Sequence, residues 1–184
     1  MVKRVWKWFA DFEKEEAWLN GMSARGWGME SFFLGFYTFR ECDFNEYIYR
    51  IELLEKSASH PESARYLAFM GETGAETVAT WARWVYFRRP ASEGDFDIYT
   101  DVESRIKHYR RIYRMLFPIS MLFLSQLFLQ SSRFVGLASR SDGFALFIAV
   151  LMVLYILLGI AVIKTGVGCY VKVKRLESLK KIRE

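Results

Sequence analysis

Side chains that commonly carry catalysis are few in this chain. Among its 184 residues there are two histidines, His60 and His108, and two cysteines, Cys42 and Cys169. His60 directly precedes Pro61, which predicts a residue at a helix N-terminus rather than a general base. His108 lies among lysines and arginines, which predicts a solvated position. The cysteines are far apart and have no histidine beside them, so the sequence predicts no zinc site.

Three aspartates, Asp95, Asp97 and Asp101, suggest the start of a calcium-binding loop. Such a loop also needs a further oxygen ligand, a glycine and a glutamate at fixed later positions. These positions hold Tyr99, Thr100 and Ile106. The sequence therefore predicts no calcium site.

A second acidic cluster, Glu13, Glu15 and Glu16, has residue types suited to acid–base catalysis. We expect instead a solvated first helical turn, where acids complement the helix dipole. The Walker A, GxGxxG, HExxH and GxSxG signatures are missing from the sequence. We therefore predict no catalytic residue, no metal and no cofactor, and a protein that is not an enzyme.

Charge divides the chain into three parts. Residues 1–114 hold 17 Lys or Arg and 18 Asp or Glu, and residues 115–163 hold only two arginines and one aspartate. Residues 164–184 hold seven basic and two acidic residues, which account for the net charge of +5. A nucleic-acid-binding protein would carry a basic folded body, so we predict no direct nucleic-acid contact.

Two long segments, residues 115–132 and 143–163, carry no Asp, Glu, Lys, Arg or His. As helices with about 1.5 Å of rise per residue, each can cross about 30 Å of hydrocarbon. Two buried core helices of a soluble protein are the alternative, but uncharged runs of this length favour membrane spans. The short connection, residues 133–142, predicts a transmembrane hairpin. The lack of charge at membrane depth argues against an independent transporter.

Lysines and arginines predict the orientation of this hairpin. Twelve of them lie just outside the two segments and two lie in the connection, which places both termini in the cytoplasm. We therefore predict a multi-pass protein of the cell membrane, with both cysteines reduced. The tail, residues 164–184, either anchors this topology or binds anionic lipid headgroups. The basic residues assigned to the lipid are Lys172, Lys174, Arg175, Lys180 and Lys181.

Residues 1–99 are predicted to form a cytoplasmic α+β domain. We expect strands over residues 3–9, 32–40, 46–54 and 77–88, with the second and third forming a hairpin. We expect helices after Asp11 and from Pro61, the second with Ala64, Leu67 and Ala68 on its apolar stripe. The order β-α-β-β-α-β predicts a ferredoxin-like fold, in which both helices cover one face of a four-stranded antiparallel sheet.

Large aromatic side chains occupy both faces of these predicted strands. A sheet face in water should be polar, so we expect the second face to be covered. A second copy of the chain or its own later segments would provide the cover, or else a partner protein or an apolar ligand. The residues assigned to partner binding are Trp6, Trp8, Tyr37, Tyr47, Tyr49 and Trp81.

Residues 100–114 are predicted to form a helical stem. Thr100 and Glu103 fit a capping box, with Thr100 at the N-cap. Val102, Ile106 and Tyr109 recur at helical spacing, and no Gly or Pro follows before the first membrane segment. We therefore expect one continuous helix from the domain into the membrane.

A motif over residues 3–54 resembles the pattern EKEExWLNxMxxxGW…YxFxxxxxxxYxYRI of a bacterial family of unknown function. The residues that carry the resemblance are residues 9, 12–16, 18–20, 22, 26–27, 37–39, 46–47 and 49–51. The resemblance brings no known reaction. It implies a genomic context, because genes of that family commonly lie beside genes for PadR-type transcriptional repressors.

Together these observations predict a membrane-anchored regulatory or sensor protein that forms homo-oligomers. Its cytoplasmic domain would bind a partner, and the resemblance suggests a PadR-type repressor. The alternative is an accessory subunit of a membrane transporter complex. A neighbouring repressor gene would favour the first function, and a transporter ATPase gene the second.

Overall fold

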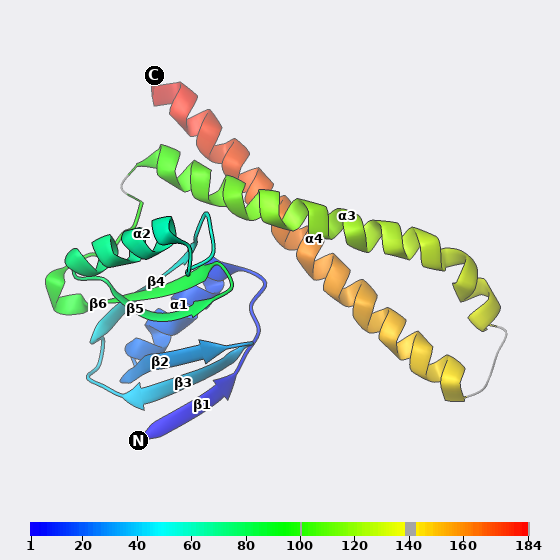
Figure 1. Ribbon diagram of the computed structural model, residues 1–184, viewed down its shortest axis with the longest axis horizontal. Coiled ribbons are helices and arrows are strands. Elements are labelled where there is room, and N and C mark those ends of the chain that lie inside the picture. The colour runs from blue at the N-terminus through cyan, green and yellow to red at the C-terminus, as the bar shows by residue number, and fades with distance from the viewer. Residues whose placement is uncertain (100, 139–142, 184) are drawn as a thin grey trace. The chain divides into compact units, whose positions relative to one another are not determined.

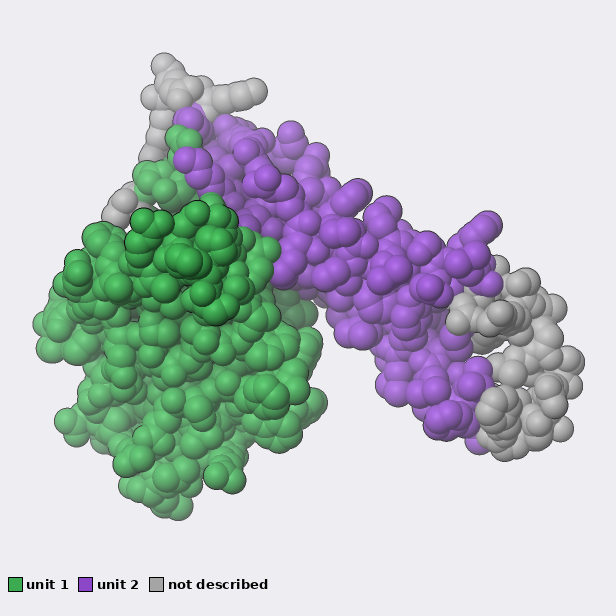
Figure 2. All heavy atoms as spheres, viewed as in Figure 1, with its two compact units in different colours: residues 1–104 green, residues 105–184 purple. Residues whose placement is uncertain are grey.

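The computed structural model describes residues 1–99, 101–138 and 143–183 (Figure 1). The chain divides into two compact units, residues 1–104 and residues 105–184 (Figure 2). The elements of unit 1 are β1 (Val2–Trp6), α1 (Phe12–Ser23), β2 (Trp27–Phe33), β3 (Phe36–Glu41), β4 (Tyr47–Leu53), α2 (Pro61–Glu72), β5 (Glu76–Trp81), β6 (Trp84–Pro90) and the 3-10 helix η1 (Ala91–Glu93). Helix α3 (Val102–Ala138) begins at the boundary, and α4 (Gly143–Arg183) follows it.

Unit 1 is an α+β domain with two three-stranded antiparallel sheets, ordered β1-β3-β2 and β4-β6-β5. This corrects the single four-stranded sheet of the ferredoxin-like prediction. The segments 32–40 and 77–88, each predicted as one strand, both contain a tight turn. The predicted hairpin of the second and third strands is also wrong, because β4 pairs with β6 in the other sheet.

Both turns lie inside apolar runs that carry little turn signal. In the first, Leu34 and Gly35 have φ of 46° and 82°, the left-handed conformation of a tight two-residue hairpin turn. In the second, Ala82 has φ of 54° and no glycine is present. Large side chains therefore continue through both turns, and for this reason the sequence predicted one long strand in place of each hairpin.

The two sheets come from an internal repeat, in which one βαββ arrangement occurs twice within unit 1. The first βαββ half, β1-α1-β2-β3, and the second βαββ half, β4-α2-β5-β6, have the same element order and the same strand order. In both, the register of the hairpin shifts at one position, between Met29 and Ser31 and between Thr77 and Ala79. Corresponding packed residues of the helices and hairpins are 48 positions apart, so the two β-bulges and the two turns coincide, although α2 begins 49 positions after α1.

Equivalent side chains build the two cores. Met22 of α1 and Met70 of α2 are both buried, as are Phe39 of β3 and Phe87 of β6. The ring of Trp18 meets Phe39 edge-on at 5.6 Å, and the ring of Tyr66, 48 positions later, meets Phe87 edge-on at 6.4 Å. The repeat is therefore preserved in packing as well as in topology.

The helices differ in how many sheets they cover. Helix α2 packs on one face of the second sheet, where Met70 joins Val85 and Phe87 in a core of its own. Helix α1 packs against both sheets, because Leu19 and Met22 share one core with residues of β3 and β4. The sheets also meet at their β2 and β5 edges, where Phe32 contacts Trp81 at a centroid distance of 6.2 Å. Helix α1 thus lies between the two sheets (Figure 1).

Unit 2 is an antiparallel pair of long helices. Arg110 forms an ion pair of 2.7 Å with Glu177, while Phe123, further along α3, contacts Tyr155, further back in α4. Both helices are long and apolar enough to cross a membrane, with candidate spans Val102–Leu129 and Leu146–Lys180. Few side chains in their most apolar windows are buried, unlike those of core helices in soluble proteins.

Helix α3 is continuous from Val102 onward, as the stem prediction requires. The predicted N-cap, Thr100, lies outside the described residues. Asp101 accepts hydrogen bonds from the backbone N–H and the hydroxyl of Ser104, both at 2.7 Å, and so caps the first turn. The predicted solvated position of His108 is wrong, because its side chain is buried.

Candidate functional site

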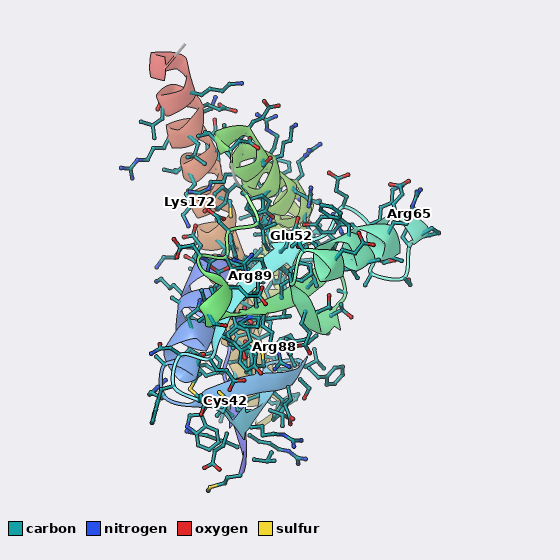
Figure 3. All side chains as sticks on the ribbon, turned by 90° about the vertical axis from the view of Figure 1, so that its left-hand side faces the viewer. Cys42, Glu52, Arg65, Arg88, Arg89 and Lys172 are labelled. Atoms are coloured by element: carbon teal, nitrogen blue, oxygen red, sulfur yellow. The ribbon has the colours of Figure 1, made fainter. Side chains whose placement is uncertain are left out.

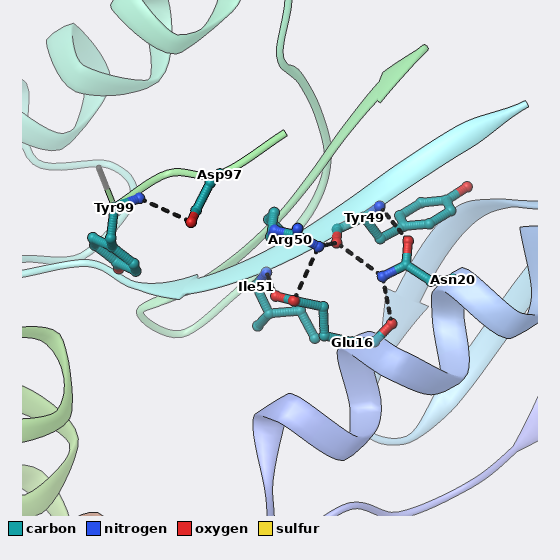
Figure 4. Close-up of polar contacts among 7 residues, drawn as sticks. All are labelled: Glu16, Asn20, Tyr49, Arg50, Ile51, Asp97 and Tyr99. Atoms are coloured by element: carbon teal, nitrogen blue, oxygen red, sulfur yellow. Dashed lines mark hydrogen bonds and ion pairs between the residues drawn. The ribbon is translucent and has the colours of Figure 1, made fainter. Parts of the chain in front are cut away.

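The open edge of β4 is covered by three polar side chains of α1. Ser23 accepts a hydrogen bond from the N–H of Tyr47 at 3.0 Å. Asn20 accepts from the N–H of Tyr49 at 2.8 Å and donates to its carbonyl at 3.2 Å (Figure 4). Glu16 accepts a hydrogen bond from the N–H of Ile51. The helix therefore takes the place of a neighbouring strand, and the free edge is protected from pairing with another chain.

Glu16 holds both the backbone and a side chain of β4. One carboxylate oxygen accepts from the N–H of Ile51 at 3.0 Å, and the other pairs with the guanidinium of Arg50 at 3.2 Å (Figure 4). Burial raises the pKa of Glu16 from its usual range, and Arg50 opposes that shift. Glu16, Asn20 and Ser23 share one face of α1 because they are spaced by four and three residues. We call these three residues the edge clamp.

A buried carboxylate joins the two sheets through the same helix. Glu15 of α1 accepts a hydrogen bond of 2.6 Å from the hydroxyl of Tyr37 in β3 and one of 2.7 Å from the hydroxyl of Tyr86 in β6. Only 8% of Glu15 is exposed, which corrects the prediction of a solvated helical turn. Desolvation raises the pKa of Glu15, and the two hydroxyls oppose that shift.

Arg88 makes a second bridge between the sheets, and Figure 3 labels it together with Cys42. From β6 it donates to the carbonyl of Met29 in β2 at 3.1 Å. Two of its nitrogens bind the carboxylate of Glu76, at 2.7 and 2.9 Å. Its guanidinium lies 4.4 Å from the ring centroid of Tyr47, which supports a cation–π contact. These contacts occupy the guanidinium within the fold.

The carboxylates of these clusters make hydrogen bonds and an ion pair within the fold. One oxygen of Glu15 accepts from two tyrosines, and Glu16 is bound to a backbone amide and to Arg50. Among the described residues, no group of three or more His, Cys, Asp or Glu side chains could hold a metal ion. His60 caps α2 by accepting from the N–H of Glu62 at 3.2 Å, as the sequence predicted.

The structure separates the six side chains that the sequence assigned to partner binding. Tyr37 and Tyr49 are buried, and the hydroxyl of Tyr49 accepts from the N–H of Met29 at 2.7 Å. Tyr47 and Trp81 are half-buried, and Trp6 and Trp8 are exposed. Sequence alternation placed large residues on both faces but did not reveal which face α1 would cover.

The bare face of the first sheet carries a row of three exposed aromatic side chains. Phe36 of β3 pairs in register with Trp6 of β1 on one side and Phe33 of β2 on the other. Their exposed fractions are 59%, 63% and 64%. We call Trp6, Phe33 and Phe36 the aromatic row. The sequence signal for Phe33 and Phe36 was present, but one continuous strand through the turn placed them on opposite faces.

One further correction concerns α2. Ala64 and Ala68 of α2 are exposed, and the buried residues of that helix are Ser63 and Met70. The basic tail is the end of α4, where Lys174 and Arg175 are exposed. Lys172 lies over the ring of Tyr109 at 5.3 Å, Lys180 is exposed, and the side chain of Lys181 lies outside the described residues.

The fold and the site together define a class of protein: an α+β domain built from two βαββ halves, followed by two long apolar helices. The sequence model of a family described as a protein of unknown function (DUF2812) matches residues 11–121, which run from the cap of α1 into α3. This match covers more than half of the chain, so the chain belongs to that family. No curated protein and no solved structure matches it significantly.

Proposed function

We propose that this protein is a membrane-anchored regulatory or sensor protein whose N-terminal domain binds a protein partner. The observation that carries the proposal is the aromatic row, which lies bare on a domain whose other sheet is covered on both faces. Exposed apolar patches of this kind mark interaction surfaces. Trp8, just beyond β1, is also exposed and extends the surface.

The two long helices would anchor this domain. Their mostly unburied apolar surfaces suit lipid. The basic end of α4 supports termini on the cytoplasmic side, because lysines and arginines are in excess in cytoplasmic segments. Cysteine labelling tests this topology. A Cys at position 139, in the connection, should react with an impermeant reagent from outside the cell, and one at position 178 should not.

The partner suggested by the family resemblance is a PadR-type transcriptional repressor. A photo-crosslinking residue at position 36 of the full-length protein, in its own membranes, tests the surface. Position 84 is the matched control, because Trp84 is the equivalent residue of the second half and is half-buried against Phe12. Cross-links to a repressor from position 36 alone would support the proposal. No protein cross-link from position 36 would overturn the partner surface.

One observation favours the alternative, an accessory subunit of a membrane complex. A cavity of about 320 Å³ opens on the helix pair of unit 2 and could accept a side chain of a neighbouring membrane helix. Its lining residues are Gln126, Leu127, Ile148, Leu151, Met152 and Tyr155. Copurification of transporter subunits with the full chain, lost on Leu151→Trp, would favour this function.

A further inference from the structure

We infer that the aromatic row lies against an anionic bilayer surface when no protein partner is bound, so that membrane contact regulates access to it. The inference rests on the proposed membrane anchoring. Trp6, Phe33 and Phe36 would sit among the lipid headgroups, with Leu34 at the tip of the turn.

The row has the composition of a membrane interface anchor. It combines an indole with two phenyl rings, and Leu34 beside it is 47% exposed. Trp residues favour the headgroup region because one edge is polar and the rest is apolar. The row lies at the end of the sheet next to the two-residue turn, where the backbone N–H of Lys7 donates to the carbonyl of Gly35 at 2.8 Å. The end of a hairpin can insert among lipid headgroups, because a bilayer surface, unlike a protein, does not need a groove of matching shape.

The charge distribution favours contact of an anionic surface with the bare face of the first sheet over contact with the rest of the domain. Residues 1–104 hold 12 Lys or Arg and 18 Asp or Glu, a net charge of −6, so most of the domain is repelled by anionic lipid. Residues 1–10 and 31–40, which include the row, hold four basic and no acidic residues. One of these, Arg40, is paired with Glu30. Arg4 is exposed and alternates in phase with Trp6, so it shares the bare face.

The remaining two cations belong to the opposite side of β1. The ammonium of Lys3 lies 5.1 Å from the ring of Trp27, and that of Lys7 lies 4.8 Å from the ring of Trp18. Arg4 is thus the cation of the bare face that can contact anionic lipid.

The helix that follows unit 1 tethers the aromatic row to the bilayer, because unit 1 continues directly into the first candidate span. Tethering of this kind gives effective concentrations on the order of millimolar, so a weak contact suffices.

The experiment uses the full chain reconstituted in vesicles that contain no other protein. Cys42 and Cys169 are replaced by Ser, and a single Cys is placed by Leu34→Cys or, as the matched control, by Ala82→Cys. Both positions are the first residue of their hairpin turn and both have positive φ. Each Cys carries an environment-sensitive fluorophore, and the vesicles contain phosphatidylcholine and nitroxide-labelled lipid, with or without phosphatidylglycerol.

We expect the label at position 34 to be quenched by the lipid nitroxide when phosphatidylglycerol is present, and the label at position 82 to remain unquenched. Arg4→Gln should lower the ratio of docked to free domain about fivefold, because each basic residue near the surface contributes that factor. Phe33→Ser with Phe36→Ser should abolish the quenching. An unchanged melting temperature shows that these exposed substitutions leave the fold intact.

Equal quenching at positions 34 and 82 would overturn the inference. So would an apolar environment at position 34 without lipid quenching but with cross-linking between copies, because a second chain would then cover the row. These outcomes are independent of the partner surface, which is tested by protein cross-links in native membranes. Failure of membrane anchoring is also distinguishable, because the chain would then not remain with the vesicles on flotation.

Discussion

The two βαββ halves share one topology but play different parts in the domain. In the second half, α2 covers one face of its sheet and α1 covers the other. In the first half, α1 is the one helix of the described part of the chain that covers the sheet, and the aromatic row is exposed. The residues of the second half equivalent to this row are Leu53, which is buried, and Trp81 and Trp84, which are half-buried.

The difference lies in the polar residues of the helices. Glu15, Glu16 and Asn20 of α1 bind the opposite half of the domain. The equivalent residues of α2 are Ser63, Ala64 and Ala68, which are 48 positions later. Ala64 and Ala68 offer no side-chain hydrogen bond to a strand edge. A repeated backbone thus becomes asymmetric because one helix carries groups that hold a second sheet and the other does not.

The equivalence of the two cores predicts the largest effects. Phe39→Ala and Phe87→Ala should each lower the free energy of unfolding by about 3–5 kcal/mol, because each leaves a cavity where a fully buried ring was. Chemical denaturation of the full chain in detergent, followed by far-UV circular dichroism, measures both. A much smaller loss for one of them would show that the two cores are not equivalent.

The different polar residues of α1 and α2 predict the next largest effects. Equivalent substitutions in the two helices should lower the free energy of unfolding by unequal amounts. Glu15→Ala should cost about 1–3 kcal/mol for each of the two tyrosine hydroxyls left without an acceptor. Ser63→Ala, the equivalent change in α2, should cost at most about 1 kcal/mol, because it removes one hydrogen bond of 3.3 Å to the carbonyl of Lys56. Similar losses for the two variants would contradict the role given to Glu15.

The edge clamp predicts a smaller contrast of the same kind. Asn20→Ala should lower the free energy of unfolding by about 1–2 kcal/mol, since the N–H of Tyr49 loses its acceptor and the carbonyl of Tyr49 keeps only the hydrogen bond from Arg50. Ala68→Asn should change it by less than about 0.5 kcal/mol, because that site is exposed. Hydrogen exchange at the amide of Tyr49 provides the local readout, and it should accelerate only in Asn20→Ala.

The smallest expected effect concerns pH. Because burial raises the pKa of Glu15 above 4.5, the folded state holds this proton to higher pH than the unfolded state. Stability should therefore fall as pH rises from about 4.5 until Glu15 is ionised in the folded protein. Glu15→Gln should flatten that fall, leaving the contribution of Glu16, whose pKa is raised as well. Identical pH profiles for the two proteins would show that Glu15 does not titrate as described.

Sequence patterns located most elements of the chain. Asp11 caps α1 by accepting from the N–H of Glu13 at 3.0 Å, and α2 begins at Pro61, both as predicted. Helix α3 is continuous as expected. Local signals sufficed in these cases because a cap, a proline at the first helical position and an uninterrupted helical spacing act within a few residues.

The repeat was not evident from the sequence because few of its positions are identical. Met22 and Met70, Gly26 and Gly74, and Phe39 and Phe87 coincide, but most exposed positions differ between the halves. The glycines recur because both have positive φ, 78° and 87°, just after a helix. Packing and backbone conformation preserve such positions, whereas exposed residues are free to diverge.

By itself, the sequence determined the α+β class of the domain, its caps, and the two long apolar helices, because these depend on periodicity and composition. Only the tertiary structure decided which aromatic side chains are buried. Tyr37 and Tyr49 lie in the core, while Phe33 and Phe36 are exposed, because α1 packs between the two sheets and leaves the outer face of the first sheet uncovered. That placement depends on contacts such as Glu15 with Tyr86, 71 positions apart, which no local pattern specifies.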